Sequence, residues 1–535
     1  MASHPDHCPL VCFEDEHLLV VNKPAGLNTH APSPFAGEGV YEWLRHREGR
    51  WANLAIIHRL DKETSGILIF AKTALANRSL TAQFTQHSIR KKYIFLTDRT
   101  APSKPITAIS SIVRLGEKYV SRPLHAGGEQ AETRFRVISS ASERTLMEAE
   151  PITGRTHQIR VHAADHGVPV LGDSLYGGAA FGRLCLHSQD IALTHPATQA
   201  KLEFRATADF SSDARFALRS ALIDPQTTNA YRVVHGASDG WPGWYVDRLG
   251  DYLLSQSDHS LSPTQLGALD HWLKLFSGRG AYHKILNRHV GRFSSQQNSP
   301  EWILGDKAPD SFVVLENGLR FELSCNEGYS LGIFLDQREN RRRFLTRHVA
   351  ASFPAFPKDL GQAQVLNAFA YTCGFSVCAA KAGARMVSVD LSKKYLEWGR
   401  RNFVLNGIDP AQHEFIYGDV FDWFRRFSKK QRLFDAIILD PPTFSRSREG
   451  GSFQAERDYD RLVTASLPLL KPDGLLFAST NSAKTPADRF IETVMKAIAA
   501  VGRTAERQHY APQPPDFPIS RDEPAYLKTL WLRVR

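Results

Sequence analysis

Residues 365–392 read VLNAFAYTCGFSVCAAKAGARMVSVDLS, and this stretch decides the fold of the C-terminal half. An apolar run leads into a turn at 371–374, then into a segment of helical character from about Phe375, and then into a second apolar run that ends at Asp390. Further apolar runs separated by helical segments lie at 414–419, 434–440 and 474–480. This alternation of strands and helices predicts βα units and therefore a parallel sheet.

The N-terminal third has a different pattern. Residues 9–24 and 106–137 contain short apolar segments separated by turns and charged residues, which predicts a strand-rich, antiparallel unit. The strand signals then fade into a polar segment that we interpret as a linker, followed by turn-rich strands and a basic helix at 338–353. We expect a first domain over 1–212, a linker over 213–228, a small central α+β domain over 229–352 and an α/β domain over 353–535.

The composition is that of a globular protein of several domains: 535 residues, 42% hydrophobic and 23% charged. No apolar run approaches the ~18 residues that cross a bilayer, and the N-terminus lacks the basic and apolar regions of a signal peptide. We therefore expect a cytoplasmic protein with no membrane partner and with its six cysteines reduced. The net charge of +10 favours a polyanionic partner, although a merely soluble basic protein explains the charge equally well.

A candidate catalytic aspartate lies in the stretch 57–72, IHRLDKETSGILIFAK. This is a polar, turn-like loop that runs into an apolar strand, and such a loop can hold Asp61 at a cleft. An aspartate with a pKa near ~3.9 is an anionic nucleophile or base at neutral pH. Surface loops also carry many aspartates without function, so the loop alone leaves both interpretations open.

Three further stretches follow the Asp61 loop: KKYIFL at 91–96, GRTHQIRVHAADHGVPVLGDSLYG at 154–177 and LCLHSQDIALTHP at 184–196. Together with the loop they resemble the RluA-type pseudouridine synthases over nearly all of residues 10–207. The resemblance implies an α+β domain with a mixed, mainly antiparallel sheet, an RNA substrate and no cofactor for this half.

Pseudouridine formation breaks the N1–C1′ bond of uridine, rotates the base and joins C5 to C1′. By the resemblance, Asp61 faces the ribose, Arg160 pairs with Asp61, Tyr93 packs on the uracil, and Arg59 enters the RNA helix where the flipped base stood. Extruding a base costs a few kcal/mol, which stacking and phosphate contacts can offset. The residues that we expect to contact the substrate in this half are His58, Lys91, Lys92 and Arg155.

Metal binding is not expected. The segment HQIRVH at 157–162 lacks the spacing of zinc ligands, so we reject zinc there. His4, His7, Cys8 and Cys12 are close in sequence, but no second ligand pair accompanies them.

Acidic residues follow three apolar runs of the C-terminal half: Asp390, Asp419 and Asp440, the last within DPPT at 440–443. A strand-end carboxylate can accept hydrogen bonds from ribose hydroxyls, although NAD would suit Asp390 equally well. With the stretches 231–253, 328–344, 367–376 and 523–528, these residues resemble the S-adenosylmethionine-dependent methyltransferases, in particular the RlmI and RlmK type of ribosomal RNA methyltransferases.

This second resemblance covers about residues 229–535 and implies a Rossmann-like class I methyltransferase domain with S-adenosyl-L-methionine as cofactor. The residues that we expect to bind the cofactor are Gln337, Phe369, Tyr371, Gly374, Ser376, Asp390, Asp419 and Asp440. The PUA module of that family is expected to be replaced here by the pseudouridine synthase.

The acceptor atom decides what else the methyltransferase needs. Cytosine C5 ordinarily requires a cysteine thiolate that attacks C6, whereas a ring nitrogen has its own lone pair. The cytosine-C5 members of the family carry a cysteine just after the strand that follows the DPP loop, but this chain has TNS at 480–482. We therefore favour a ring nitrogen, with guanine N7 as the leading candidate. The residues expected to act on the base are Asp440, Pro441 and Asn481.

These observations predict one chain with two RNA-modifying activities and no obligatory protein partner. Ribosomal RNA, 23S in particular, is the favoured substrate, and transfer RNA stays open as an alternative. Three further alternatives stay open at this point. The C-terminal half could methylate cytosine C5, the chain could be an RNA-binding or ribosome assembly factor with one inactive half, or the methyl acceptor could be a small molecule or protein.

Overall fold

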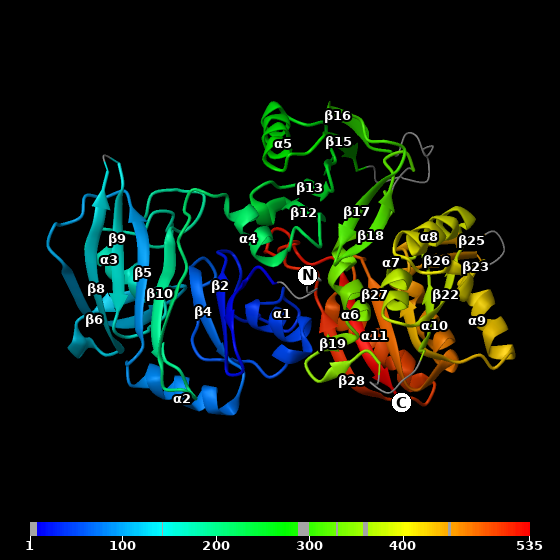
Figure 1. Cartoon of the computed structure of the whole chain (residues 1–535), viewed down its shortest axis with the longest axis horizontal. Helices are drawn as coiled ribbons and strands as arrows, with labels where there is room; N and C mark the ends of the chain where they lie inside the picture. Colours follow the sequence, from blue (N-terminus) through cyan, green and yellow to red (C-terminus); the bar gives the residue numbers. More distant parts are fainter. Residues whose placement is uncertain (1–7, 142, 287–298, 328–329, 357–361, 448–450) are drawn as a thin grey trace.

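The computed structural model describes residues 8–141, 143–286, 299–327, 330–356, 362–447 and 451–535. His4, His7 and the first two residues of the 328–344 stretch lie outside the described residues. Over the described residues, three large sheets follow one another along the chain (Figure 1), besides three two-stranded ones: the N-terminal sheet in blue and cyan, the central one in green, and the C-terminal one in yellow to red. Among the described helices, none combines the length and hydropathy of a membrane span.

The N-terminal domain forms, over the described residues, one sheet of eleven strands. Among its described strand pairs, only β4 and β10 run parallel, and the others are antiparallel. This confirms the predicted mixed, mainly antiparallel sheet. In spatial order the main path is β1 (Val11–Glu14), β2 (Leu18–Lys23), β4 (Ser65–Ala71), β10 (Leu186–Thr194), β5 (Arg90–Thr97), β9 (Thr145–Pro151), β8 (Glu129–Ser140), β6 (Ile106–Leu115) and β7 (Lys118–Arg122). The strands β3 (Ala55–Ile56) and β11 (Lys201–Arg205) pair with β4 and β10, and the helices are α1 (Val40–Arg47), α2 (Ala74–Thr85) and α3 (Gln158–Asp165).

Gly66 allows the close approach of β4 to β10. Its φ is +116°, and a Cβ atom at this position would lie 2.2 Å from the carbonyl oxygen of Ser188. Only glycine tolerates both the conformation and the contact. Because Gly66 follows Asp61 by five residues, this crossing fixes where the Asp61 loop leaves the sheet.

The central region contains a five-stranded sheet in the order β12 (Ala230–His235), β13 (Trp244–Leu249), β14 (Tyr252–Ser257), β15 (Gly280–Ile285) and β16 (Glu301–Gly305). The other elements are α5 (Pro263–Leu275), the hairpin β17 (Phe312–Glu316) and β18 (Leu319–Leu323), α6 (Arg338–Leu345), and the short strands β19 (His348–Ala350) and β20 (Phe353–Pro354). The segment 213–228, which we interpreted as a linker without regular structure, instead contains helix α4 (Ala214–Leu222). Its residues Leu218 and Leu222, one turn apart, are both buried.

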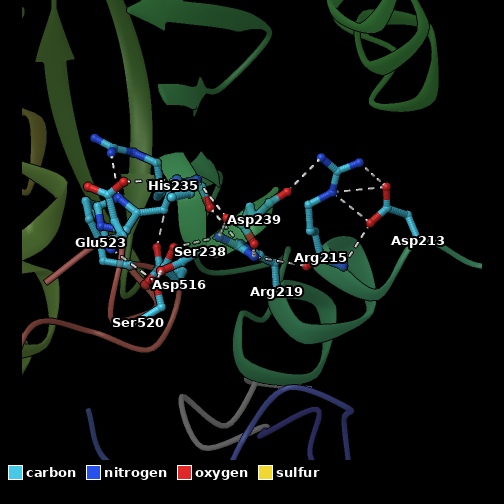
Figure 2. Close-up of polar contacts among 12 residues, drawn as sticks. Asp213, Arg215, Arg219, His235, Ser238, Asp239, Asp516, Ser520 and Glu523 are labelled. Atoms are coloured by element: carbon cyan, nitrogen blue, oxygen red, sulfur yellow. Dashed lines mark hydrogen bonds and ion pairs between the residues drawn. The ribbon is translucent and has the colours of Figure 1, made fainter. Parts of the chain in front are cut away.

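A polar network joins this central region to the C-terminal segment (Figure 2). Arg219 of α4 is 2% exposed and donates from Nη2 to Asp239 Oδ2 at 2.7 Å and to the carbonyl of Asp516 at 2.8 Å. Glu523 accepts from the backbone amide of Ala237 at 3.0 Å and from the hydroxyl of Tyr245 at 2.9 Å. The network therefore holds the segment around 516–523 against the central sheet.

The C-terminal domain has a seven-stranded sheet in the order β23 (Glu414–Tyr417), β22 (Arg385–Asp390), β21 (Gln364–Ala368), β24 (Phe434–Leu439), β27 (Leu470–Thr480), β29 (Lys528–Val534) and β28 (Ala505–Ala511). The first five strands of this order are parallel to one another, which confirms the predicted parallel sheet. Strand β29 pairs antiparallel with both β27 and β28. The helices are α7 (Gly374–Lys381), α8 (Lys393–Leu405), α9 (Val420–Lys429), α10 (Ala455–Ser466) and α11 (Ala487–Ala500), and β25 (Phe444–Ser447) and β26 (Gly451–Gln454) form a hairpin after DPPT.

Helix α1 of the N-terminal domain docks against α6, and Figure 1 shows it beside β19 and β28. Arg342 donates from Nη2 to Glu48 Oε1 at 2.5 Å, and Arg47 Nη1 lies 3.2 Å from Glu339 Oε2. Glu38, His46 and His509 also meet here, with candidate ligand atoms within 4.8 Å of one another. Because Glu38 Oε1 pairs with His46 Nδ1 at 2.7 Å and lies 3.7 Å from Arg343 Nη2, we interpret this cluster as part of the ionic interface.

Candidate functional sites

The Asp61 loop opens into a cleft of about 910 Å³ in the N-terminal domain. Its walls come from the loop before β4, from β5 and from the start of α3. Sequence-predicted residues that line it are His58, Arg59, Asp61, Lys91, Tyr93, Arg155 and Arg160.

Lys23 fixes the Asp61 loop from inside the domain. Its fully buried ammonium group donates to the carbonyls of Pro24 at 2.9 Å, Leu27 at 2.7 Å and Lys62 at 3.0 Å. Burial lowers the pKa of Lys23 to about 7. On the other side of Asp61, Thr29 Oγ1 donates to the carbonyl of Leu60 at 2.8 Å. The backbone carbonyls of both neighbours of Asp61, Leu60 and Lys62, are therefore hydrogen-bonded. Sequence reasoning missed Lys23; the available signal was the Lys-Pro pair at the end of the second strand.

Arg160 has a different principal partner from the one predicted. Its Nη1 lies 3.7 Å from Asp61 Oδ2, but Nε and Nη2 donate to the two carboxylate oxygens of Asp173 at 2.7 and 2.8 Å. The side chain of Asp173 is 1% exposed and that of Asp61 28%. Asp173 therefore orients the guanidinium, while Asp61 keeps an accessible carboxylate. Sequence reasoning did not select Asp173 as a site residue. Its position in GDSLYG at 172–177, within the quoted stretch 154–177, could have indicated it.

His157 is a second neighbour of Asp61 that sequence reasoning did not select. Its Nε2 lies 3.8 Å from Asp61 Oδ2, and its Nδ1 lies 2.8 Å from the hydroxyl of Tyr176. The Tyr176 oxygen accepts from the backbone amide of Tyr119 at 2.9 Å, so its proton is directed to Nδ1. Burial lowers the pKa of His157, and in the neutral ring the proton then resides on Nε2, facing Asp61.

Strand β5 presents only alternate side chains to the cleft. Tyr93 and Lys91 line it, and burial raises the pKa of Tyr93 to about 12, so the phenol stays protonated. Lys92, which we expected to bind the substrate, instead points to the opposite face, where its Nζ lies 3.8 Å from Glu148 Oε2. Lys92 is therefore not among the residues that line the cleft, because neighbouring residues of a strand face opposite sides of the sheet, and its contact with the substrate stays a prediction.

The remaining residues of this cleft differ in exposure. His58 Nε2 accepts from the backbone amide of Ile69 at 3.1 Å, and its ring stacks on Phe84 at 4.9 Å. Burial lowers the pKa of His58 to about 3, so it is a neutral structural side chain at the base of the cleft. Arg59 is exposed, and Arg155 lies at the rim with Nη1 3.0 Å from Glu129 Oε2.

In the C-terminal domain, the turn between β21 and α7 spans residues 369–373 and has an unusual backbone. We call it the cofactor turn, because it contains the predicted cofactor residues Phe369 and Tyr371. Phe369, Tyr371 and Cys373 have φ angles of +81°, +49° and +64°, a conformation that costs non-glycine residues free energy and is often retained at ligand sites. Asp390 at the end of β22 holds this turn, since Oδ2 accepts from the amide of Tyr371 and Oδ1 from that of Ser392, both at 2.8 Å. Each oxygen retains acceptor capacity, so the arrangement fits a ligand with ribose hydroxyls.

Three other predicted cofactor residues, Asp419, Gly374 and Ser376, have different structural settings. Asp419 caps α9 through Oδ1, which accepts from the amides of Phe421 and Asp422 at 2.9 and 3.2 Å. Gly374 packs against Arg341, whose Cδ would lie 3.2 Å from a Cβ atom. The Ser376 side chain is fully buried and bonded to Asn367 and Ser388 at 2.9 Å, so its hydroxyl supports the turn from within rather than facing a ligand.

Gln337 is hydrogen-bonded to Asp440, which is itself one of the predicted cofactor residues. Its Nε2 donates to Asp440 Oδ1 at 3.1 Å and to Ser479 Oγ at 2.8 Å, while its Oε1 accepts from Asn340 at 2.7 Å. Three hydrogen bonds of this amide are therefore made within the protein, and its contact with the cofactor stays a prediction. Burial raises the pKa of Asp440 to about 6.

The DPPT loop and the end of β27 lie side by side. Thr443 Oγ1 donates to Asn481 Oδ1 at 2.7 Å, and both side chains are exposed. Pro441 is buried. Asp440, Asn481 and the cofactor turn all lie at the carboxyl ends of the parallel strands, where α/β folds bind their ligands.

The three cysteines of residues 213–535 are unsuited to nucleophilic attack. Cys325, Cys373 and Cys378 are all buried. Burial raises the pKa of Cys325 and Cys373 to about 12 and also raises that of Cys378. The thiolate form is therefore scarce at neutral pH.

Comparison with known proteins identifies both halves. Residues 17–165 match the family described as RNA pseudouridylate synthase, and residues 231–533 match the S-adenosylmethionine-dependent methyltransferases. The chain belongs to the S-adenosylmethionine-dependent methyltransferase family, and its N-terminal domain is an RluA-type pseudouridine synthase domain. It is thus an isomerase and a transferase in one polypeptide, with S-adenosyl-L-methionine, which carries an activated methyl group, as cofactor of the second half.

Individual relatives match one half each. A ribosomal RNA large subunit methyltransferase of Deinococcus radiodurans is 35% identical over 333 residues, which cover 60% of this chain and 78% of that protein. The ribosomal RNA large subunit methyltransferase I of Aeromonas salmonicida is 31% identical over 59% of this chain and 78% of its own length. The ribosomal large subunit pseudouridine synthase C of Vibrio cholerae is 39% identical over 218 residues. These residues cover 38% of this chain and 65% of that relative.

Proposed function

We propose that this chain modifies ribosomal RNA at two independent sites. The N-terminal domain isomerises uridine to pseudouridine, and the C-terminal half transfers a methyl group to a ring nitrogen, with guanine N7 as the acceptor. The observation that carries the nitrogen assignment is the burial of Cys325, Cys373 and Cys378. A cytosine-C5 reaction needs an accessible thiolate, whereas guanine N7 supplies its own lone pair.

In the synthase cleft, the carboxylate of Asp61 faces the ribose of the flipped uridine. Arg160, held by Asp173, and the Nε2–H of His157 orient that carboxylate from two sides. The N1–C1′ bond breaks, the base turns, and the C5–C1′ bond forms; C5 gives up a proton and N1 gains one, so the composition does not change. Tyr93 packs on the base, Lys91 and Arg155 contact phosphates, and Arg59 enters the RNA helix.

In the methyltransferase half, the chain's own residues align donor and acceptor, because displacement at the methyl group depends chiefly on orientation. Asp390 and the turn 369–373 hold the ribose end of the cofactor, and Asp419 meets its adenine. Asp440, positioned by Gln337 and Ser479, orients the acceptor base together with Pro441 and the exposed Asn481.

We propose 23S ribosomal RNA as the common substrate, which places the enzyme in the cytoplasm where ribosomes are assembled. The proposal rests on the names of the relatives that match each half and on the positive net charge of the chain. No protein partner is needed for either reaction as proposed.

The test is to map pseudouridine and methylated bases in ribosomal RNA from cells with and without the gene. Complementation with Asp61→Asn should restore the methylated base only, and complementation with Asp440→Ala should restore pseudouridine only. Each variant thereby serves as the folding control of the other. A product of 5-methylcytosine, or a covalent adduct of the protein with RNA containing 5-fluorocytosine, would replace the nitrogen assignment with the cytosine-C5 reaction.

A further inference from the structure

Two exposed aromatic rings belong to the two chain segments that meet at the hydrogen bond between Gln337 and Asp440. Phe444, four residues after Asp440, is 56% exposed, and Phe334, three residues before Gln337, is 45% exposed. The hydrogen bond from Gln337 to Asp440 brings the Phe334 segment to the DPPT loop. Phe334 also lies beside the cofactor turn, since its ring centroid is 5.3 Å from that of Tyr371. Large exposed rings next to a reaction site are unfavourable in water and are typical of ligand contacts.

Asp336 lies between Phe334 and Gln337 and is a carboxylate that the reaction described above does not use. Its Oδ2 accepts from the hydroxyl of Tyr526 at 2.9 Å. Burial raises the pKa of Asp336, the Tyr526 hydroxyl, Arg232 and Arg341 oppose this rise and Asp247 adds to it, and Asp336 in turn raises the pKa of Asp440. Two carboxyl groups therefore face the same region, which is a costly arrangement that is common at functional sites. One hydrogen bond leaves Asp336 with unused acceptor positions.

We propose that Phe334, Asp336 and Phe444 form the binding site for the methyl-accepting base and select guanine. The two rings stack on a base that has left the RNA stack, and the carboxylate of Asp336 accepts hydrogen bonds from guanine N1–H and N2–H₂. This inference rests on the proposed methylation of guanine. It names the residues that choose the base, as distinct from Asp440, which positions it for reaction.

The chemistry of the four bases supports guanine as the occupant. Guanine alone presents two neighbouring donor groups on its Watson–Crick edge, which match the two oxygens of one carboxylate. Adenine and cytosine present an amino group beside an acceptor nitrogen, and that nitrogen would face the carboxylate unfavourably. Because the Watson–Crick edge lies on the opposite side of the purine from N7, a guanine held by Asp336 turns N7 away from Asp336. Stacking of a base on an aromatic ring is tolerant of base identity, so the discrimination belongs to Asp336.

The experiment uses the full chain and an RNA fragment that contains the mapped methylation site. The wild type and Asp336→Asn are assayed on this fragment and on the same fragment with inosine at the target, which lacks only the N2 amino group. The asparagine oxygen can still accept from Tyr526, so the fold is preserved. We expect the wild type to methylate the inosine fragment at least about tenfold more slowly, as for one lost hydrogen bond to a charged group. Asp336→Asn should be slow on both fragments, with no preference between them.

The stacking contribution is tested with Phe334→Ala and Phe444→Ala. Each should reduce kcat/KM for methylation roughly 5- to 150-fold, the range for one stacked base, with pseudouridine formation unchanged. Calorimetric titration with S-adenosylmethionine separates a loss of base stacking from a loss of cofactor binding. Leu433→Ala is the matched control, because Leu433 is 44% exposed but precedes β24, at the end of the sheet opposite Asp440. It should leave all readouts at the wild-type level.

The outcomes distinguish this inference from the proposed function. If the wild type makes 7-methylguanosine but Asp336→Asn still prefers guanosine to inosine as strongly, the guanine proposal stands and the role of Asp336 is wrong. If the two phenylalanine variants lose only cofactor affinity, the rings belong to the cofactor site and the stacking role is wrong. If the wild type makes 5-methylcytosine, both the proposed acceptor and the guanine site are wrong.

Discussion

The ion pair between Arg160 and Asp173 orients the side chains of the synthase cleft, and Asp173 itself takes no part in the proposed bond changes. Asp173 is almost fully buried and binds both Nε and Nη2 of Arg160. This bidentate contact leaves Nη1 directed to Asp61 at 3.7 Å. Asp173 thus acts on Asp61, the proposed reacting carboxylate, through Arg160.

Asp173→Asn should therefore impair both stability and pseudouridine formation. Breaking one side of a buried ion pair leaves an uncompensated charge and costs about 3–5 kcal/mol in the free energy of unfolding. Chemical denaturation followed by a probe in the N-terminal domain measures the loss, and pseudouridine assays measure the effect on activity. Glu132→Gln, which alters a surface pair with Arg134 in the same domain, should leave both unchanged. Full activity of Asp173→Asn would show that Asp61 alone positions Arg160.

The raised pKa of Asp440 predicts a pH dependence for methylation. If the ionised carboxylate orients the base, methylation should decline as the pH falls through about 6, since the protonated form then dominates. The hydrogen bond from Gln337 favours the ionised form, while Asp336 opposes it. Gln337→Leu should therefore raise this pKa further and move the decline to a higher pH. A pH profile of single-turnover methylation on cofactor-saturated enzyme is the measurement, and a profile that does not move in Gln337→Leu would contradict the assignment.

At the scale of elements, local patterns predicted most strands and helices, but contacts between distant segments were not predictable. The apolar runs around 365–392 gave β21, α7 and β22 because each run is complete in itself. Helix α4 carries local signals that were overlooked, namely the Asp213 cap and the pair Leu218 and Leu222 one turn apart. The bond of its Arg219 to the carbonyl of Asp516, 297 residues along the chain, was not predictable. The candidate sites show the same difference. Asp61, Asp390 and Asp440 could be selected from local motifs, whereas the hydrogen bond of Gln337 to Asp440 joins segments 103 residues apart and could not be predicted.

The turn between β21 and α7 is the proposed binding element for the ribose of the cofactor, and Asp390 holds the backbone of this turn. Asp390→Ala removes the acceptor of two backbone amides, Tyr371 and Ser392. The expected loss is about 1.5–3 kcal/mol, or at least roughly tenfold in affinity for S-adenosylmethionine. Isothermal titration is the measurement, and Asp409→Ala, which uncaps an exposed turn in the same domain, is the control. Equal affinities for wild type and Asp390→Ala would mean that the cofactor is held elsewhere.

At the scale of the whole molecule, helix α1 connects the two enzymes. The loop before it borders the synthase cleft through Thr29, which is bonded to Leu60. Its C-terminal end contacts α6, which begins directly after Gln337. The charges across this contact are paired, so the interface is a fixed ionic junction rather than a flexible tether.

Arg342→Met should loosen this junction without touching either reaction site. It leaves Glu48 without its partner in a largely buried setting, at a cost of about 3–5 kcal/mol to the docked state. We expect differential scanning calorimetry to show the two halves unfolding in more widely separated transitions, with both activities retained on short RNA fragments. Arg457→Met removes an exposed pair with Asp458 and should have no such effect. Unchanged unfolding of Arg342→Met would show that the halves are held by other contacts.

The ionic junction between α1 and α6 also has a consequence for avidity. Two linked sites raise the effective concentration of a shared ligand only when the ligand can span both. With the two clefts held at one separation and orientation, we expect an RNA fold that presents both target nucleotides at the matching spacing to bind the intact chain more tightly than either half. An RNA with a single target gains nothing from the fusion. If one RNA carries both targets, as proposed, the junction makes the distance between the two nucleotides, and not their sequence alone, a criterion of substrate choice.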